Sequence, residues 1–191
     1  MTIPRCSWVP PANARYVAYH DDEWGVPCHD ELRLFEMLNL EGAQAGLSWS
    51  TILNKRETYR LAFDGWDARK IALYEADKVA QLLADPGIVR NRLKVAATIA
   101  NAQAYLRLCD EVGGLDAYLW GYVGAVPVRG GTTPVPAKTT LSDQVSKDLR
   151  KRGFKFVGST IVYAYLQGIG IVNDHAPHCY LYTGEVPVAQ A

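Results

Sequence analysis

The spacing of apolar residues between helix-breaking residues limits most strongly what this chain can fold into. Apolar side chains recur at helical intervals along most of the sequence, while strict alternation and β-branched residues are rare. Asp30 and Ser48 stand where N-caps belong, and the Gly113–Gly114 pair interrupts the pattern. The sequence therefore predicts an all-α fold, with helices expected over residues 30–47, 49–63, 67–71, 75–84, 89–109 and 115–123.

The last third of the chain is less regular. Residues 124–139 are rich in Gly, Pro and Thr and predict a surface loop. Residues 140–143 resemble a capping box for a following helix, and the apolar stretch 158–170 fits either a buried helix or a strand. We expect one domain over residues 1–191, with a flexible tail at 184–191.

Composition excludes several classes of protein. Hydrophobic residues make up 49% of the 191 residues and charged residues 21%, which is ordinary globular usage and argues against disorder. No apolar run approaches the roughly 18 residues of a membrane span, and the N-terminus lacks a signal peptide, so we expect a cytoplasmic protein. Twenty basic residues balance twenty acidic ones, which disfavours charge-driven nucleic-acid binding but permits a local basic patch.

Glu41 is a carboxylate on an apolar helix face. Leu38, Met37 and Leu34 lie three, four and seven residues before it. A buried carboxylate costs several kcal/mol unless it is partnered, so Glu41 either caps the next segment or lines a pocket. Trp49 follows after a tight connection, and it either packs in the core or stacks on a flat ring that Glu41 reads at the edge.

Cysteine and histidine spacing suggests a metal site. His175 and Cys179 are separated as two ligands on one helical turn can be. Either Cys6 with His20 or Cys28 with His29 could complete a Cys2His2 set, and free thiols with surface histidines remain the alternative. A closed Cys2His2 site would be structural, because no ligand position is vacant.

Two basic segments could contact DNA. Residues 82–102 read as helix, Pro-Gly turn and helix, and the second helix begins among Arg90, Arg92 and Lys94. Residues 147–158 carry five basic residues and two Phe, a mixture that fits a nucleic-acid face. Either segment could instead be an ordinary solvated surface. The basic residues of the second segment are Lys147, Arg150, Lys151, Arg152 and Lys155.

Together these segments resemble the 3-methyladenine DNA glycosylase I family of the helix-hairpin-helix superfamily. The resemblance runs from residue 6 to residue 179. It is carried by CSW (6–8), YHDDEWGVP (19–27), LFEML (34–38), LEGAQAGLSW (40–49), the hairpin region, KRGFKFVGSTIVY (151–163) and VNDH (172–175) with Cys179.

The resemblance implies roles for individual residues. One structural Zn²⁺ would be held by Cys6, His20, His175 and Cys179 and would join the N- and C-terminal segments. The expected fold is that of a helix-hairpin-helix glycosylase. Cys28, His29, Cys109 and His178 match no ligand of the family. Glu41 would read the damaged base and is the catalytic candidate. Leu47, beside Gly46, would enter the gap in the DNA. The remaining base-binding residues implied are Tyr19, Trp49, Trp8, Tyr16 and Trp24.

The implied activity is that of a monofunctional glycosylase, a monomer that binds double-stranded alkylated DNA and no membrane. It would flip out 3-methyladenine and hydrolyse its bond to the sugar, leaving an abasic site. A cationic base suits electron-rich rings and one carboxylate. Residues 88–109 contain no Asp or Glu, so the hairpin helix supplies no general base. The alternatives are a zinc-stabilised module that binds DNA without cleaving it, and a metallohydrolase that uses Asp174 and His175.

Overall fold

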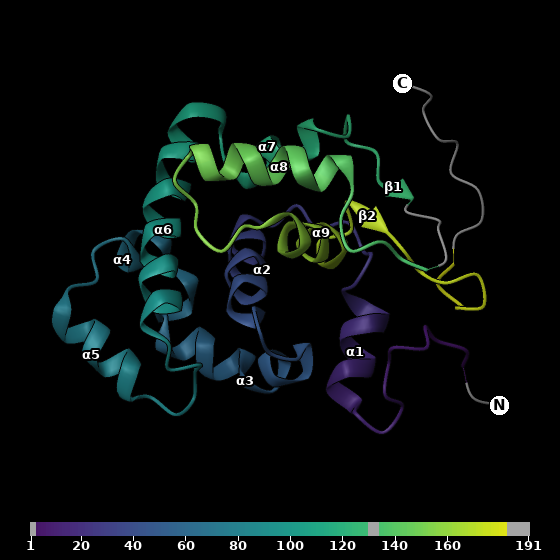
Figure 1. Cartoon of the computed structure of the whole chain (residues 1–191), viewed down its shortest axis with the longest axis horizontal. Helices are drawn as coiled ribbons and strands as arrows, with labels where there is room; N and C mark the ends of the chain where they lie inside the picture. The colour runs from purple at the N-terminus through teal and green to yellow at the C-terminus, as the bar shows by residue number, and fades with distance from the viewer. Residues whose placement is uncertain (1–2, 130–133, 183–191) are drawn as a thin grey trace.

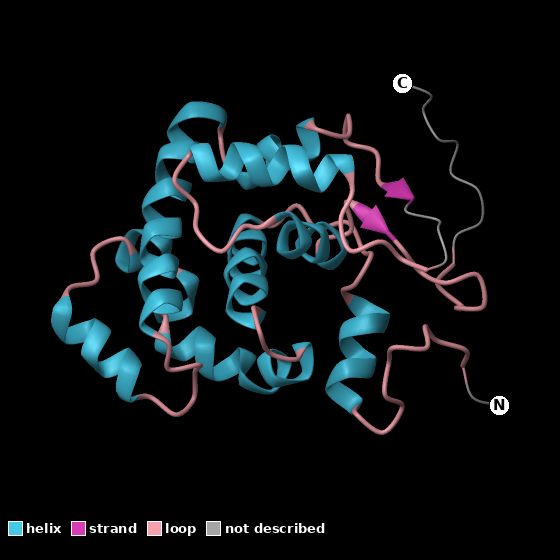
Figure 2. Ribbon diagram, in the orientation of Figure 1, coloured by secondary structure: helices cyan, strands magenta, loops and turns pink. Residues whose placement is uncertain are grey.

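A computed structural model describes residues 3–129 and 134–182 of the chain. The described residues are mostly helical, as Figures 1 and 2 show. The predicted tail at 184–191 lies outside the described residues. The elements are α1 (Ala14–Asp22), α2 (Glu31–Gln44), α3 (Trp49–Ala62), η1 (Asp64–Trp66), α4 (Ala68–Ile71), α5 (Ala76–Ala84), α6 (Arg92–Val112), α7 (Leu115–Gly121), β1 (Val128–Arg129), α8 (Thr140–Lys151), α9 (Ser159–Gly168) and β2 (Val172–Asn173).

Helix α2 is the centre of the packing. It contacts α3, α6, α7 and α9, and it lies in the middle of the view in Figure 1. Its residues from Leu34 to Ala43 are all buried, so this part of the helix is covered on every side, as in a core helix. Two of these buried residues, Glu36 and Glu41, are acidic. Glu36 is neutralised by Arg56 and Arg60, whereas Glu41 has no ion-pair partner among the described residues.

The predicted caps of the first helices are confirmed. Asp30 accepts a hydrogen bond from the backbone N–H of Arg33, and Ser48 accepts one from that of Thr51. These side chains satisfy amides that a helix start leaves free. Between the two helices the chain turns sharply at Gly46, whose φ is +76°, a value that suits a residue without a Cβ.

Several predicted boundaries are wrong by a few residues. Helix α6 begins at Arg92 rather than 89, because the Asn91 side chain caps the N–H groups of Leu93 and Lys94. It ends at Val112, and Gly113 caps it in a left-handed conformation. The capping box of α8 is formed by Thr139 and Ser142, one residue earlier than predicted.

Three further features were open or absent in the sequence prediction. The apolar stretch 158–170 contains a helix, α9. Helix α1 was not predicted, since it is short and its stability comes from packing of residues such as Tyr19 and His20. Strands β1 and β2 pair in parallel, Val128 opposite Val172, so the described fold is not strictly all-α. Two-residue strands are too short to show alternation in a sequence.

In the described part of the chain, no helix combines the length and apolar character needed to cross a membrane.

Candidate functional site

A pocket of about 260 Å³ opens between α1, α2, α3 and α9. It contains Glu41 together with every aromatic residue that the sequence prediction assigned to base binding. Its lining residues are Trp8, Tyr16, Tyr19, Trp24, Glu41, Gln44, Trp49, Val135, Ala164 and Gln167.

The rings line the pocket at angles to one another. The centroids of Tyr19 and Trp49 are 5.2 Å apart with the rings tilted by 53°. Trp8 makes an edge contact with Trp24 at 4.8 Å and a tilted contact with Tyr16 at 5.7 Å. These contacts hold large flat faces around one hollow, and such faces attract a planar cation.

Glu41 is the unusual group of the pocket. Its side chain is 4% exposed, and no described residue donates a hydrogen bond to it or forms an ion pair with it. Burial raises the pKa of Glu41 to about 8. Ser48, and not Glu41, caps the following helix, so the expectation of a capping role is wrong. A buried carboxyl without a partner at the wall of a pocket is a group arranged for a ligand.

Two further polar groups in the pocket have no partner among the described residues. The indole Nε1–H of Trp49 is buried and forms no hydrogen bond. The hydroxyl of Tyr19 is likewise unpaired, and burial raises the pKa of Tyr19 well above its usual value, which keeps the hydroxyl protonated. The pocket therefore offers two donors and one carboxyl to a ring that enters it.

Residues that the sequence prediction missed also shape the pocket. Gln167 reaches it from α9, and its Nε2 donates to Asp174 at 2.5 Å. Tyr163 donates to the same carboxylate oxygen at 2.6 Å. Gly168 leaves room for the site, because a Cβ there would lie 3.0 Å from the Tyr19 hydroxyl and 3.7 Å from Glu41 Oε1. A single amide within the apolar stretch 158–170 was the available signal for Gln167.

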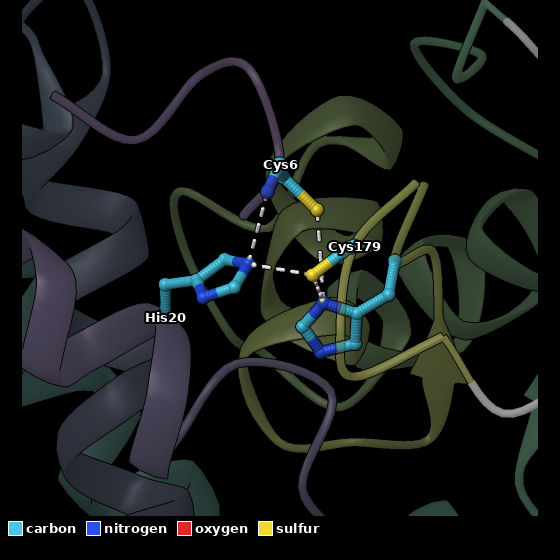
Figure 3. A group of neighbouring side chains, drawn as sticks. Cys6, His20 and Cys179 are labelled. Atoms are coloured by element: carbon cyan, nitrogen blue, oxygen red, sulfur yellow. Dashed lines mark hydrogen bonds between the residues drawn. The ribbon is translucent and has the colours of Figure 1, made fainter. Parts of the chain in front are cut away.

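Four side chains converge from the two ends of the described chain: Cys6, His20, His175 and Cys179. Figure 3 labels three of them, Cys6, His20 and Cys179. All four are buried, and their donor atoms lie within 4.8 Å of one another. Cys28 and His29, the alternative pair, are not part of this group. His29 instead lies 2.7 Å from Asp116 and stacks on Trp120.

The four side chains fit a tetrahedral metal ion. The Sγ of Cys179 lies 3.4 Å from His20 Nε2 and 3.6 Å from His175 Nδ1, and the Sγ of Cys6 lies 3.7 Å from His175 Nδ1. Zinc bonds to sulfur and nitrogen at tetrahedral angles would separate such atoms by about 3.6 Å. Two thiols with two imidazoles are also the donors that Zn²⁺ prefers.

The outer nitrogens of both histidines are oriented as metal-bound imidazoles usually are. His20 Nδ1 lies 2.7 Å from Asp21, which also accepts hydrogen bonds from Arg5. His175 Nε2 lies 3.0 Å from the backbone carbonyl oxygen of Trp24, to which it can donate. Such outer contacts fix the tautomer that leaves the other nitrogen free for a metal.

The predicted DNA-contact residues of the first basic segment divide into two groups. Arg90 and Arg92 are exposed beside the turn between α5 and α6, and Leu47 is exposed at the connection between α2 and α3. Lys94, in contrast, is directed inward, and its Nζ donates to the carbonyl oxygens of Ala43 and Ala45 at 2.7 Å. Lys94 thus differs from the prediction of a phosphate contact.

The second basic segment contacts the first toward its end, where the backbone of Lys155 exchanges hydrogen bonds with the Asn101 side chain, but its Arg152 lies far from the hairpin. Arg152 forms ion pairs with Asp148 and Glu111, and Glu111 lies at the opposite end of α6 from the hairpin. Helix α6 has 21 residues, a length of roughly 30 Å. Lys151 and Lys155 are exposed, but Phe154 is buried in the core and offers no stacking surface.

Comparisons with known proteins agree with one another. Residues 8–182 match the family model described as methyladenine glycosylase. The chain is 47% identical over 188 residues to DNA-3-methyladenine glycosylase 1 of Escherichia coli (strain K12), which covers 97% of this chain and 100% of that protein. A crystal structure of 3-methyladenine DNA glycosylase I has a TM-score of 0.89 at 44% identity, covering 94% of this chain and 100% of the other. A second 3-methyladenine DNA glycosylase I, a tyrosine-to-phenylalanine variant solved in complex with 3-methyladenine, has a TM-score of 0.85 at 35% identity, covering 88% of this chain and 92% of the other.

Proposed function

We infer that this chain is a DNA-3-methyladenine glycosylase, because it belongs to the methyladenine glycosylase family. It releases 3-methyladenine from alkylated DNA in base excision repair. We place this activity at the aromatic pocket, because the pocket contains the carboxyl of Glu41, which has no partner among the described residues.

The pocket residues divide the work of recognition. Trp49 and the other rings cover the faces of the extruded base, and Tyr19 donates a hydrogen bond at its edge. Glu41 accepts from the base and, once ionised, balances its positive charge. Because alkylation at N3 makes the base cationic, these interactions favour the damaged base over neutral adenine.

The chemistry needs little from the protein beyond this binding. The bond between the base and C1′ of the sugar breaks, and its electron pair stays with the base, which leaves as a neutral molecule. A water oxygen then bonds to C1′ and gives its proton to solvent. The sugar becomes cationic in the transition state, and the ionised Glu41 would stabilise that charge electrostatically as well. Residues 88–109 contain no acidic side chain, and we assign no general base.

We assign a structural Zn²⁺ to Cys6, His20, His175 and Cys179. When bound, the ion would link the N- and C-terminal segments, and four protein ligands would fill its tetrahedral positions. Asp174 is engaged by Tyr163 and Gln167 rather than belonging to the ligand group. This arrangement disfavours a metallohydrolase built on Asp174 and His175.

The DNA would approach over the connection between α2 and α3 and the hairpin between α5 and α6. Gly46 and Leu47 would enter the gap left by the flipped nucleotide, and Arg90 and Arg92 would neutralise phosphates in the manner of a helix-hairpin-helix. A monomer suffices for this binding to double-stranded DNA in the cytoplasm, since the pocket is complete within one chain.

Base release tests the proposal. Methylated duplex DNA is incubated with the protein, and the released bases are separated by chromatography. We expect free 3-methyladenine and an abasic site in the strand. Binding of the DNA without any base release would favour the alternative, a module that binds lesions without cleaving them.

A further inference from the structure

Lys94 connects the hairpin to the end of α2. Its Nζ donates to the backbone carbonyl oxygens of Ala43 and Ala45, both at 2.7 Å. The side chain is partly buried, and no described carboxylate forms an ion pair with it. A lysine placed in this way uses its charge within the protein rather than on a surface phosphate.

These two bonds complete the hydrogen bonding of the connection after α2. The carbonyl oxygen of Gly42 accepts from the N–H of Ala45 at 3.3 Å, and that of Gln44 accepts from the N–H of Leu47 at 2.6 Å. Lys94 supplies donors for the two carbonyls that alternate with them, Ala43 and Ala45. The last carbonyls of a helix lack partners within it, and a cation there also favours the helix dipole.

The connection held in this way lies between the two parts of the proposed site. Glu41, in the pocket, precedes it by two residues, and the exposed Leu47 follows. Lys94 is also anchored at its own backbone, because its N–H donates to the Asn91 side chain at the start of α6. One residue therefore joins the hairpin, the connection and the end of the helix that carries Glu41.

We propose that Lys94 is a positioning residue that holds residues 43–47 in the geometry needed to enter the DNA duplex. The proposal rests on the proposed glycosylase function. Docking of the hairpin on the DNA backbone and entry of Leu47 then occur as movements of one rigid unit. Without the clamp, the pocket still binds a free base, but the connection enters the duplex poorly.

The test separates the pocket from the connection. Lys94→Met is compared with the wild type for its affinity for free 3-methyladenine, its rate of base release from duplex DNA, and the fluorescence of 2-aminopurine placed beside an abasic-site analogue. For Lys94→Met we expect unchanged affinity for the free base and base release slowed by about tenfold or more. We also expect loss of the signal, that is, of the change in 2-aminopurine fluorescence that the wild type produces when it binds the duplex. Lys94→Arg, which can also donate to two carbonyls, should restore most of the rate and the signal.

Lys70→Met is the matched control, because it removes an exposed lysine on α4 whose ion-pair partner within residues 3–129 and 134–182 is Asp67 alone. Lys94→Gln serves in the same way as the Met variant if the latter fails to fold. A Lys94→Met protein with wild-type rate and signal would overturn the proposal, as would a free-base affinity that falls in step with the rate. A wild-type protein that releases no base would contradict the proposed function instead, and the 2-aminopurine signal would still test Lys94.

Discussion

Glu41 shows at the scale of one residue how function opposes stability in this protein. Its carboxyl is buried, no residue in the described part of the chain pairs with it, and burial raises its pKa to about 8. The same environment that penalises its charge in the free protein strengthens its interaction with a cationic base. A residue of this kind lowers stability, and we propose that its use lies in binding the cationic base.

The raised pKa predicts how Glu41→Gln changes stability with pH. The folded protein keeps the proton of Glu41 up to about pH 8, whereas the unfolded chain loses it near the ordinary value of 4.5. The Glu41 contribution to the free energy of unfolding therefore falls as pH rises between these values. Gln stays neutral, so the variant should be more stable than the wild type by up to a few kcal/mol at pH 8.5, and by little at pH 5.

Urea unfolding at the two pH values measures this difference. Glu57→Gln is the control, since Glu57 is on the exposed face of α3. A stability difference between wild type and Glu41→Gln that does not change with pH would show that the carboxyl titrates normally.

Part of the pocket could be predicted from the sequence, because some residue types are costly to bury. A Glu on an apolar helix face and a nearby Trp are visible in the sequence, while their common pocket with Tyr19 and Trp24 came from family resemblance. The inward direction of Lys94 was not predictable, because it depends on how α6 packs against the end of α2. Gln167 was missed for the same reason, as its orientation is set by Asp174.

At the scale of elements, the connection between α2 and α3 should affect DNA but not the free base. Leu47 is 41% exposed, so Leu47→Ala should change stability by no more than about 0.5 kcal/mol. It should slow base release from duplex DNA and leave the affinity for free 3-methyladenine unchanged. Base-release kinetics and a fluorescence titration with the free base measure the two effects. An equal loss of base-release rate and of free-base affinity would show that Leu47 supports the pocket instead.

The hairpin should supply the salt-dependent part of DNA binding. Removing both Arg90 and Arg92, which are exposed, should reduce the slope of log affinity against log salt by about 2. The comparison is a variant with Lys151 and Lys155 replaced by Ala, which should change the slope less. A larger change of the salt slope in that second variant would indicate that the DNA binds at α8 instead.

Long helices were predictable because each carries its own cap and its own apolar period. Asp30, Ser48 and the Gly113 break all act where predicted. The start of α6 was misplaced because Val89 is apolar but precedes the cap at Asn91. Helix α1 and the β1–β2 pair depend on contacts that are distant in sequence, and local patterns do not contain them.

At the scale of the whole molecule, the proposed metal site and the pocket share their chain segments. Trp8 follows Cys6 by two residues, Tyr19 precedes His20, and the Trp24 carbonyl oxygen faces His175. A change at the ligand group therefore moves aromatic walls of the pocket. Spacing alone had left two ligand sets open, since it could not show that residues 6 and 20 meet residues 175 and 179.

Metal removal should consequently weaken both stability and base binding. Chelation should lower the Tm by about 10 °C. The Tm of a chain of this size changes by roughly 2–4 °C per kcal/mol, so this corresponds to a loss of roughly 3–5 kcal/mol in the free energy of unfolding. The affinity for free 3-methyladenine should fall with it, and added Zn²⁺ should restore both. Calorimetry and base titration on the same samples measure the two effects. An unchanged affinity for the base after metal removal would show that the metal site does not support the pocket.

We propose that the buried carboxyl of Glu41 drives base release. The pH dependence of kcat/KM for release of 3-methyladenine from duplex DNA, in wild type and Glu41→Gln, tests it most directly. We predict that the wild-type value rises about tenfold per pH unit below pH 8 and levels off above it, following the ionisation of Glu41 in the free enzyme. The Gln variant should be slow and independent of pH over this range. A Gln variant with the wild-type rate and pH profile would contradict the account.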